Sequence, residues 1–177
     1  MISAHDFINL LQNHQIWISS KSIDTDTYIK GKPITNSNLI QDGDAFICIK
    51  GFEKDGHQFI KQAREKGASL IIQEDDFIDD FPAIRVSNSR KAAALLSKLH
   101  FNNPSSKFTL IGITGTNGKT TTSLIIWQIL VSLGYKVGWI GTLGYQIESG
   151  IVPTKNTTPD IIELNEIFDT FVKSGCK

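Results

Sequence analysis

Short, mainly apolar runs alternate with segments of helical periodicity along the chain, and this alternation predicts an α/β fold. Apolar runs of four or five residues between polar turns are typical of buried strands, and they lie at 45–49, 68–72 and 83–86. Apolar residues three and four positions apart predict helices, and this spacing occurs at 4–12, 57–66 and 89–101. We expect Ser3 to cap the first of these helices and Gly67 to end the second.

The second half of the chain continues the alternation with fewer elements. The pattern predicts strands at 108–111 and 136–140 and helices at 123–133 and 160–173. A turn-rich segment at 102–106 separates the halves, so we expect two domains, 1–103 and 104–177. Two strands and two helices are too few for a parallel sheet covered on both faces, and we therefore expect the chain to stop within its second domain.

The composition is that of a globular protein without a strong net electrostatic field. Of the 177 residues 40% are hydrophobic, and 18 basic side chains balance 18 acidic ones. This balance favours neither a nucleic-acid nor a membrane partner. The first residues lack a basic region and a long apolar core, so we expect no secretion signal and a cytoplasmic location. Cys48 and Cys176 are interpreted as a buried small side chain and an incidental terminal thiol.

The segment 112–121, Gly-Ile-Thr-Gly-Thr-Asn-Gly-Lys-Thr-Thr, carries the strongest chemical signal. Its place between an expected strand and an expected helix is that of a phosphate-binding loop, in which glycines let successive amides face an anion. The helix N-terminus adds partial positive charge. Lys119 can reach the β- and γ-phosphates of a nucleoside triphosphate, and the Thr120 hydroxyl can help hold Mg²⁺. The candidate nucleotide-binding residues are Gly115, Thr116, Asn117, Gly118, Lys119, Thr120 and Thr121.

Alternatives to a phosphate site remain at this loop. The common pattern places a glycine five residues before Gly118, where this chain has Ile113, and glycine-rich turns before helices also occur without a ligand. A kinase or another phosphate-loop hydrolase should carry an aspartate after a later apolar strand, and none follows the loop. Elsewhere, His57 is interpreted as part of a helix cap, and the acidic residues at 74–76 and 79–80 as a solvated loop without a role.

Three groups of residues make the chain similar to the Mur ligase family, and within it to the subfamily that adds the third amino acid of the peptidoglycan stem. The first is the Thr-Gly-Thr-Asn-Gly-Lys-Thr loop at 114–120. The second is Gly-Asp-Ala-Phe at 43–46 with Asp-Gly-His at 55–57, which resembles the family's uridine-binding domain. The third is Asn-Thr-Thr-Pro at 156–159, which resembles the segment that holds the muramyl substrate in this subfamily.

The resemblance implies a small UDP-binding α/β domain followed by the beginning of a parallel-sheet ATPase domain. It implies ATP with Mg²⁺ at the loop, Lys119 as the catalytic residue and Thr120 as a metal ligand. It further implies that UDP-N-acetylmuramoyl-dipeptide is held by Ser37, Asn156, Thr157 and Thr158. On spacing alone, 156–158 is an Asn/Thr turn with Thr158 as the N-cap of the next helix.

The implied activity is ATP-dependent amide formation between UDP-N-acetylmuramoyl-L-alanyl-D-glutamate and meso-diaminopimelate or L-lysine, in a monomer. The chain departs from the family at 36–38, where Asn-Ser-Asn replaces Asp-Ser-Arg and removes a fixed charge. The family's later substrate, metal and acceptor segments are not among these residues, so we expect the 177 residues alone to form no amide. The alternative function is a non-catalytic module that binds a nucleotide or a UDP-sugar.

Overall fold

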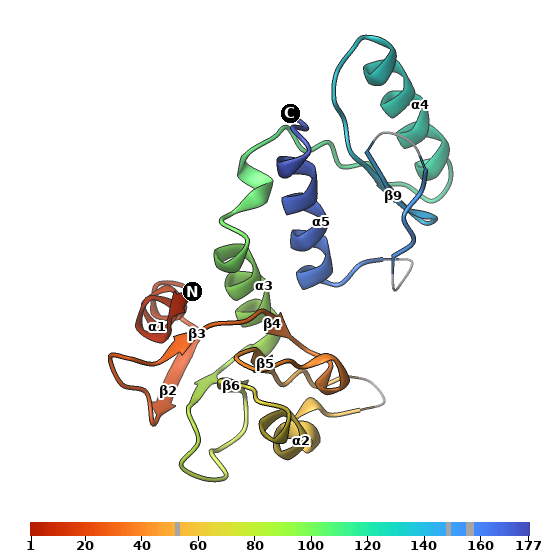
Figure 1. Cartoon of the computed structure of the whole chain (residues 1–177). Coiled ribbons are helices and arrows are strands. Elements are labelled where there is room, and N and C mark those ends of the chain that lie inside the picture. Colours follow the sequence, from red (N-terminus) through yellow and green to blue (C-terminus); the bar gives the residue numbers. More distant parts are fainter. Residues whose placement is uncertain (52–53, 148–149, 155–157) are drawn as a thin grey trace. The chain divides into compact units, whose positions relative to one another are not determined.

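The computed structural model describes residues 1–51, 54–147, 150–154 and 158–177, and it divides into two compact units, Met1–His100 and Phe101–Lys177 (Figure 1). Each unit combines helices with strands, so the predicted α/β class is confirmed.

The first unit is built on a five-stranded mixed sheet with the order β2-β7-β6-β5-β4. The neighbours from β4 to β7 are parallel, and β2 joins β7 antiparallel. The strands are β2 Trp17–Lys21, β4 Pro33–Ile34, β5 Ala45–Ile47, β6 Leu70–Gln73 and β7 Ala83–Val86, and a separate ladder pairs β1 Ile2–Ser3 with β3 Tyr28–Ile29. Strands β5 and β7 fall within the predicted runs, and β6 overlaps the predicted run at 68–72 and ends one residue later. The sequence pattern missed β1, β3 and β4, which have two residues each, and it also missed the longer β2, because the alternating half-buried and exposed residues of β2 are those of an edge strand.

The helices of the first unit lie where the periodicity predicts them, except for the short η1, which was not predicted. They are α1 Ala4–Asn13, η1 Ser37–Leu39, η2 Gly56–Phe59, α2 Ile60–Glu65 and α3 Ser89–His100. Ser3 caps α1 as predicted, because its Oγ accepts the His5 N–H at 3.2 Å. Gly67 follows α2 with a φ of +92°, which glycine adopts without a steric penalty. The helix predicted at 57–66 begins as the 3-10 turn η2, whose N-cap is Asp55, and continues as α2.

The core of the first unit lies on both faces of the parallel strands. Every residue of β5 and β6 is buried, as expected when helices cover a parallel sheet from both sides. Figure 1 shows α2 on one face and α1 with α3 on the other. On the α2 face, Phe46 and Ile71 pack with Ile60 and Ala63 of that helix. The carboxyl ends of β5 and β6 are therefore held side by side at one edge of a rigid sheet.

Asp44 is a buried carboxylate that stabilises the turn before β5. Its Oδ1 accepts the Lys32 N–H at 2.7 Å, and its Oδ2 accepts the Gln41 N–H at 2.8 Å. Asp44→Ala leaves both N–H groups without this acceptor, so we expect the free energy of unfolding to fall by about 2–4 kcal/mol in urea titrations. The exposed neighbour Asp42 provides the control, since Asp42→Ala should change stability by no more than about 0.5 kcal/mol. Equal effects of the two substitutions would contradict this role.

The second unit has a small aromatic core. Its elements are η3 Pro104–Ser106, α4 Lys119–Ser132, β8 Trp139–Gly141, β9 Gly144–Gln146 and α5 Ile161–Lys173. Phe171 of α5 lies edge-on to Phe108 and to Tyr145, with ring centroids 6.3 Å and 6.1 Å apart. Cys176 is buried in the same cluster, which corrects its interpretation as an incidental terminal thiol, and both cysteines are free. The two helices predicted in this half are confirmed.

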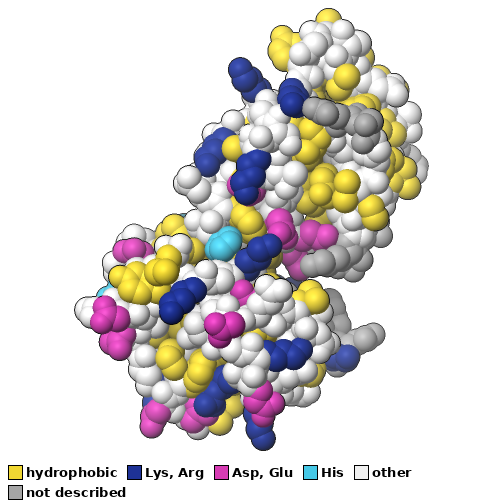
Figure 2. All heavy atoms as spheres, in the orientation of Figure 1, with side chains coloured by type: hydrophobic (Ala, Val, Ile, Leu, Met, Phe, Trp, Pro, Cys, Tyr) yellow, Lys and Arg dark blue, Asp and Glu magenta, His cyan; other side chains and the backbone are white. Residues whose placement is uncertain are grey.

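The strand predicted at 108–111 is not formed. Strand β8 pairs antiparallel with β9, and no described strand hydrogen-bonds to 108–111. A strand exists only with a hydrogen-bonded neighbour, and an apolar run does not reveal whether one is present. Leu110 and Ile111 are 59% and 57% exposed, and Figure 2 shows further hydrophobic side chains on the surface of this unit. Among the described residues no helix combines the length and the apolar character needed to cross a membrane.

Candidate functional site

The N-terminus of α4 lies directly behind the glycine-rich loop. Gly118 is its N-cap, with a left-handed φ of +79°, and the Gly118 carbonyl accepts the Thr122 N–H at 2.8 Å. A left-handed N-cap explains the glycine at this position, because other residues are strained there. No side chain caps the helix. The first amide groups of a helix have no acceptor within it, so this end of α4 presents N–H donors to an anion.

The side chains of Lys119 and Thr120 lie at the same helix end. The Lys119 ammonium donates to the carbonyls of Gly115 at 2.7 Å and Thr116 at 3.3 Å, and therefore lies against its own loop. Lys119, Thr120 and Thr158 line one cavity of about 650 Å³ within the second unit. The structure thus brings together one residue of the expected muramyl segment and two of the loop. Asn156 and Thr157 lie outside the described residues.

Thr158 is not the N-cap of the following helix. Asp160 has this role in α5, since its Oδ1 accepts the N–H groups of Ile162 at 2.9 Å and Glu163 at 2.8 Å. The alternative interpretation of Thr158 as a cap is therefore wrong. Asp160 is the better cap because a carboxylate accepts two donors at once and carries charge that the helix N-terminus favours.

Two tryptophans fix α4 beside the segment that leads into β8. The indole N–H of Trp127 donates to the Val137 carbonyl at 3.0 Å. The indole N–H of Trp139 donates to Ser123 Oγ at 2.8 Å, and that hydroxyl donates to the Thr120 carbonyl at 2.9 Å. The first turn of α4 is thus connected to the buried Trp139 through one hydroxyl. Sequence reasoning assigned no role to these indoles.

Ser37, the candidate for the uridine end of the substrate, belongs to the first unit. It is buried, and its hydroxyl donates to Gln62 Oε1 at 2.7 Å. The Gln62 amide in turn donates to Asn38 Oδ1 at 3.3 Å. The hydroxyl proton of Ser37 is therefore engaged within the protein, and its oxygen remains the atom that can accept from a ligand.

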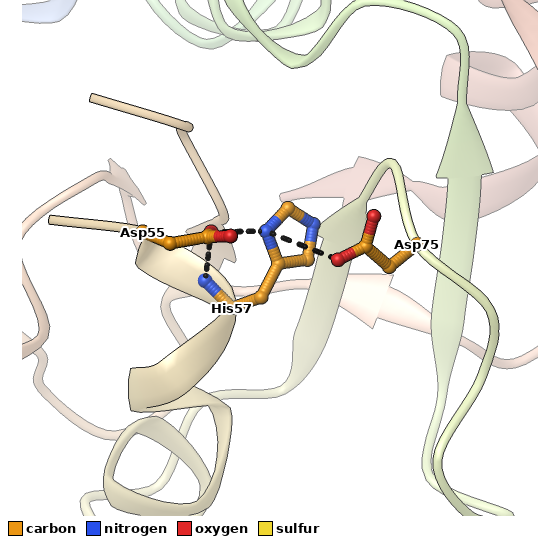
Figure 3. Close-up of side chains that lie close together, drawn as sticks. All are labelled: Asp55, His57 and Asp75. Carbon is orange, nitrogen blue, oxygen red and sulfur yellow. Dashed lines mark hydrogen bonds and ion pairs between the residues drawn. The ribbon is translucent and has the colours of Figure 1, made fainter. Parts of the chain in front are cut away.

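A cluster of Asp55, His57 and Asp75 lies at the carboxyl edge of the sheet, and sequence reasoning missed it. Figure 3 shows the His57 ring between the two carboxylates. His57 Nδ1 is 2.6 Å from Asp55 Oδ1 and 3.8 Å from Asp75 Oδ2, and the ring is almost fully buried. The cluster forms because Asp55 and His57 follow β5 while Asp75 follows β6, and parallel neighbours end at the same edge. The interpretation of His57 as only a cap is incomplete, since its ring also has two side-chain contacts.

Ion pairs, hydrogen bonds and burial shift the pKa values of the residues in and around the cluster. The Lys50 ammonium lies 2.6 Å from Asp75 and lowers the pKa of that carboxyl, while the pKa of Lys50 is raised. The backbone N–H and then the ring of His57 lower the pKa of Asp55. Burial, with Asp55 and Asp75 nearby, raises the pKa of the Cys48 thiol well above its usual range, so this thiol is unreactive.

The three residues are spaced closely enough to suggest a metal site, but hydrogen bonds and an ion pair already occupy the atoms that would bind the metal. Their ligand atoms lie within 4.8 Å of one another. However, the Glu74 N–H donates to His57 Nε2 at 3.1 Å, which leaves Nδ1 as the protonated nitrogen that donates to Asp55. Neither ring nitrogen then offers a lone pair to a cation, and Lys50 already neutralises Asp75. The geometry is that of a hydrogen-bonded network.

The lowered pKa values of Asp55 and Asp75 predict a loss of stability in acid. Both carboxyls stay ionised in the folded chain at a pH where the unfolded chain, with values near 3.8, takes up protons. Their contribution is therefore complete above about pH 5 and is lost as the pH falls through 3.8 and then through the folded pKa. We expect the urea concentration at the midpoint of unfolding to fall more between pH 5 and pH 3 in the wild-type chain than in the Asp55→Asn variant. Parallel pH profiles would contradict this assignment.

Comparison with known proteins connects both units to one family. The model described as the Mur ligase family, catalytic domain, matches residues 34–105, and that described as the Mur ligase middle domain matches 113–177. The two matches together cover most of the chain. The chain belongs to the Mur ligase family.

Curated Mur ligases resemble the chain over most of its length. The UDP-N-acetylmuramoyl-L-alanyl-D-glutamate–2,6-diaminopimelate ligase of Clostridium perfringens is 48% identical over 142 residues, which are 79% of this chain and 29% of the relative. The ligase of the same name from Bacillus cereus is 41% identical over 140 residues, 79% of this chain and 28% of the relative. The chain thus spans less than a third of the length of the curated Mur ligases it matches.

Solved structures of Mur ligases share the fold. A UDP-N-acetylmuramoyl-L-alanyl-D-glutamate–2,6-diaminopimelate ligase matches with a TM-score of 0.70 at 23% identity, over 82% of this chain and 30% of that chain. The UDP-N-acetylmuramoylalanyl-D-glutamyl-2,6-diaminopimelate–D-alanyl-D-alanyl ligase of Acinetobacter baumannii matches with a TM-score of 0.55 at 25% identity, over 75% of this chain and 28% of that chain. The predicted family and the α/β class are therefore confirmed.

Proposed function

We propose that the chain supplies the UDP-binding domain and the phosphate loop of an ATP-dependent ligase of peptidoglycan synthesis. Its substrates are ATP, UDP-N-acetylmuramoyl-L-alanyl-D-glutamate and a diamino acid. The names of the relatives that are 41–48% identical favour 2,6-diaminopimelate as that amino acid. The balanced charge of the chain gives no general attraction to nucleic acid or to an anionic membrane, and we propose a cytoplasmic monomer that acts on small molecules.

The observation that carries this proposal is the uncapped N-terminus of α4 behind the glycine-rich loop. The amides at 119–121 and the Lys119 ammonium would bind the phosphates of ATP, with Gly115, Thr116, Asn117 and Gly118 shaping the loop. Lys119 would exchange its bonds to two loop carbonyls for phosphate oxygens. Because the Thr120 hydroxyl is a hard oxygen donor at the loop, it fits Mg²⁺, which neutralises phosphate charge when bound.

The muramyl substrate would be held by neutral hydrogen-bonding groups. Thr158 lines the same cavity as Lys119 and Thr120, which supports a position near the transferred phosphoryl group. Asn156 and Thr157 precede it in the chain and are proposed for the same role. Ser37 is proposed for the uridine end, with its oxygen as acceptor. Each such bond contributes about 0.5–1.5 kcal/mol, so orientation rather than affinity is their main effect.

The reaction proceeds in two steps in this proposal. A carboxylate oxygen of the muramyl dipeptide attacks the γ-phosphorus of ATP, which forms an acyl phosphate and releases ADP. The amine of the diamino acid then attacks the acyl carbon, forms the amide and releases phosphate. Phosphoryl transfer depends on positioning and on neutralising charge, which are the tasks of Lys119 and the loop amides.

A chimera tests the proposed function. In it, this chain replaces the matching segment of the Clostridium perfringens ligase, and the product is measured by mass spectrometry with ATP, Mg²⁺, the muramyl dipeptide and diaminopimelate. We expect an ATP-dependent tripeptide product, which is lost with Lys119→Met. If the chimera binds ATP and the UDP-muramyl dipeptide but forms no product, the result would support the alternative of a non-catalytic binding module.

A further inference from the structure

Helix α4 begins at the phosphate loop but has no buried face. The structure describes every residue of this helix, and each is at least partly exposed. Burial of an apolar face is what usually fixes a helix in place, so other contacts gain weight here. Two indole N–H groups connect α4 with its neighbours: Trp127 of the helix donates to the Val137 carbonyl, and Trp139 of β8 donates to Ser123 Oγ. The second bond lies next to the first turn of α4.

The Ser123 hydroxyl transmits the bond of Trp139 to the first turn. It accepts the indole N–H at 2.8 Å and donates its own proton to the Thr120 carbonyl at 2.9 Å. An indole N–H can only donate, so the hydroxyl must turn its proton away from the ring and toward the carbonyl. Trp139 therefore fixes the rotation of the hydroxyl and, through it, the peptide group that follows Thr120.

The indole of Trp139 is itself held in place by its surroundings. Trp139 is 4% exposed, and it lies in β8, which pairs with β9. A Cβ at Gly141 would overlap the ring, so the glycine leaves the space that the indole occupies. The donor that reaches Ser123 is thus fixed by packing rather than by a flexible side chain. Support of this kind keeps the residues of a binding site in one geometry.

We propose that Trp139 is a positioning residue for the phosphate loop: through Ser123 it holds the first turn of α4 in the orientation that presents its amides and Thr120 to the nucleotide. The inference rests on the proposed function, which assigns ATP with Mg²⁺ to this loop. Groups that are fixed before binding lose less conformational entropy when they meet the phosphates. Trp139 does not need to touch the nucleotide, since its N–H already donates to Ser123.

The two indoles of this unit provide a matched pair of variants. Trp139→Phe keeps an aromatic ring but removes the N–H, and we expect it to bind ATP with Mg²⁺ about 3- to 10-fold more weakly in calorimetry on the full chain. Trp127→Phe removes the same donor from a bond to Val137 further along the helix, so its affinity should stay within about twofold of wild type. Equal losses in both variants would indicate a general loosening of α4 and would overturn the positioning role.

A double substitution tests whether the effect passes through Ser123. Ser123→Ala removes the same connection from its other side, so we expect a loss of ATP affinity similar to that of Trp139→Phe. Because both changes break one bond, the double variant should bind no more than about twofold more weakly than either single variant. Losses that multiply in the double variant would show that the two residues act independently, and would contradict the proposed connection.

NMR of the ligand-free chain supplies a readout that does not depend on ATP. We expect the amide signals of residues 119–121 to move in Trp139→Phe and to keep their positions in Trp127→Phe. If wild type binds ATP and Trp139→Phe binds it equally well, the positioning role is wrong and the proposed function stands. If wild type does not bind ATP, the proposed function fails. The ligand-free spectra then decide the positioning role, because unchanged signals of 119–121 in Trp139→Phe would overturn it.

Discussion

Lys119→Met is expected to weaken ATP binding about 10- to 100-fold, because a hydrogen bond to a charged group contributes about 1.5–3 kcal/mol. The methionine keeps a flexible side chain of similar length but removes the ammonium that lies against the Gly115 and Thr116 carbonyls. The loop backbone and the helix end are unchanged, so the remaining amides should still bind phosphate weakly. The dissociation constant for ATP with Mg²⁺, measured by calorimetry, tests this expectation.

Lys107 provides the matched control for Lys119. It is an exposed lysine of the same unit and does not line the cavity that Lys119 and Thr120 share. Lys107→Met should leave the ATP dissociation constant within about twofold of wild type, since exposed charges at a distance are screened by salt. An equal loss of affinity in both variants would indicate a general effect of net charge and would contradict the role of Lys119.

Phe171→Ala is expected to remove about 3–5 kcal/mol from the stability of the second unit. Phe171 is 4% exposed and contacts Phe108, Phe168 and Tyr145 edge-on or at a tilt, so its loss opens a cavity at the centre of a small core. Because the unit has few other buried residues, we expect the variant to be largely unfolded in this unit at 25 °C.

Tryptophan fluorescence can follow the second unit by itself. Trp127 and Trp139 belong to this unit and Trp17 to the first, so a Trp17→Phe background reports on the second unit alone. In that background Phe171→Ala should shift the emission toward that of the urea-unfolded chain. Val172, the half-buried neighbour of Phe171, serves as the control, and Val172→Ala should keep the emission spectrum of the folded chain. A folded spectrum for Phe171→Ala would show that the aromatic cluster is not the core of this unit.

Local patterns predicted most of the elements because their causes are local. Helices α1, α3 and α5 follow from apolar spacing, and the caps at Ser3 and Gly67 follow from residue type. The wrong or missing predictions concern strands, whose formation depends on a neighbouring strand that the local sequence does not reveal. Strand β2 was missed because an edge strand has polar residues. The strand at 108–111 was predicted wrongly, because an apolar run does not show whether a second strand will pair with it.

The same distinction holds for the candidate sites. The phosphate loop is contiguous in sequence, so its residues could be named before the structure was known, although their ligand remains a proposal. The Asp55–His57–Asp75 cluster joins segments that are separated by a helix and a strand. Only the parallel pairing of β5 with β6 brings Asp75 to His57, and acidic residues in a surface loop give no signal of that pairing. The Asp-Gly-His segment was the one local indication.

An NMR titration of the full chain with ATP and Mg²⁺ tests the central claim most directly. The account predicts that the amide signals of residues 115–121 shift progressively with ATP, while those of Met1–His100 keep their positions. Shifts that are confined to the first unit, or loop amides that do not respond at millimolar ATP, would contradict the assignment of this loop as the nucleotide site.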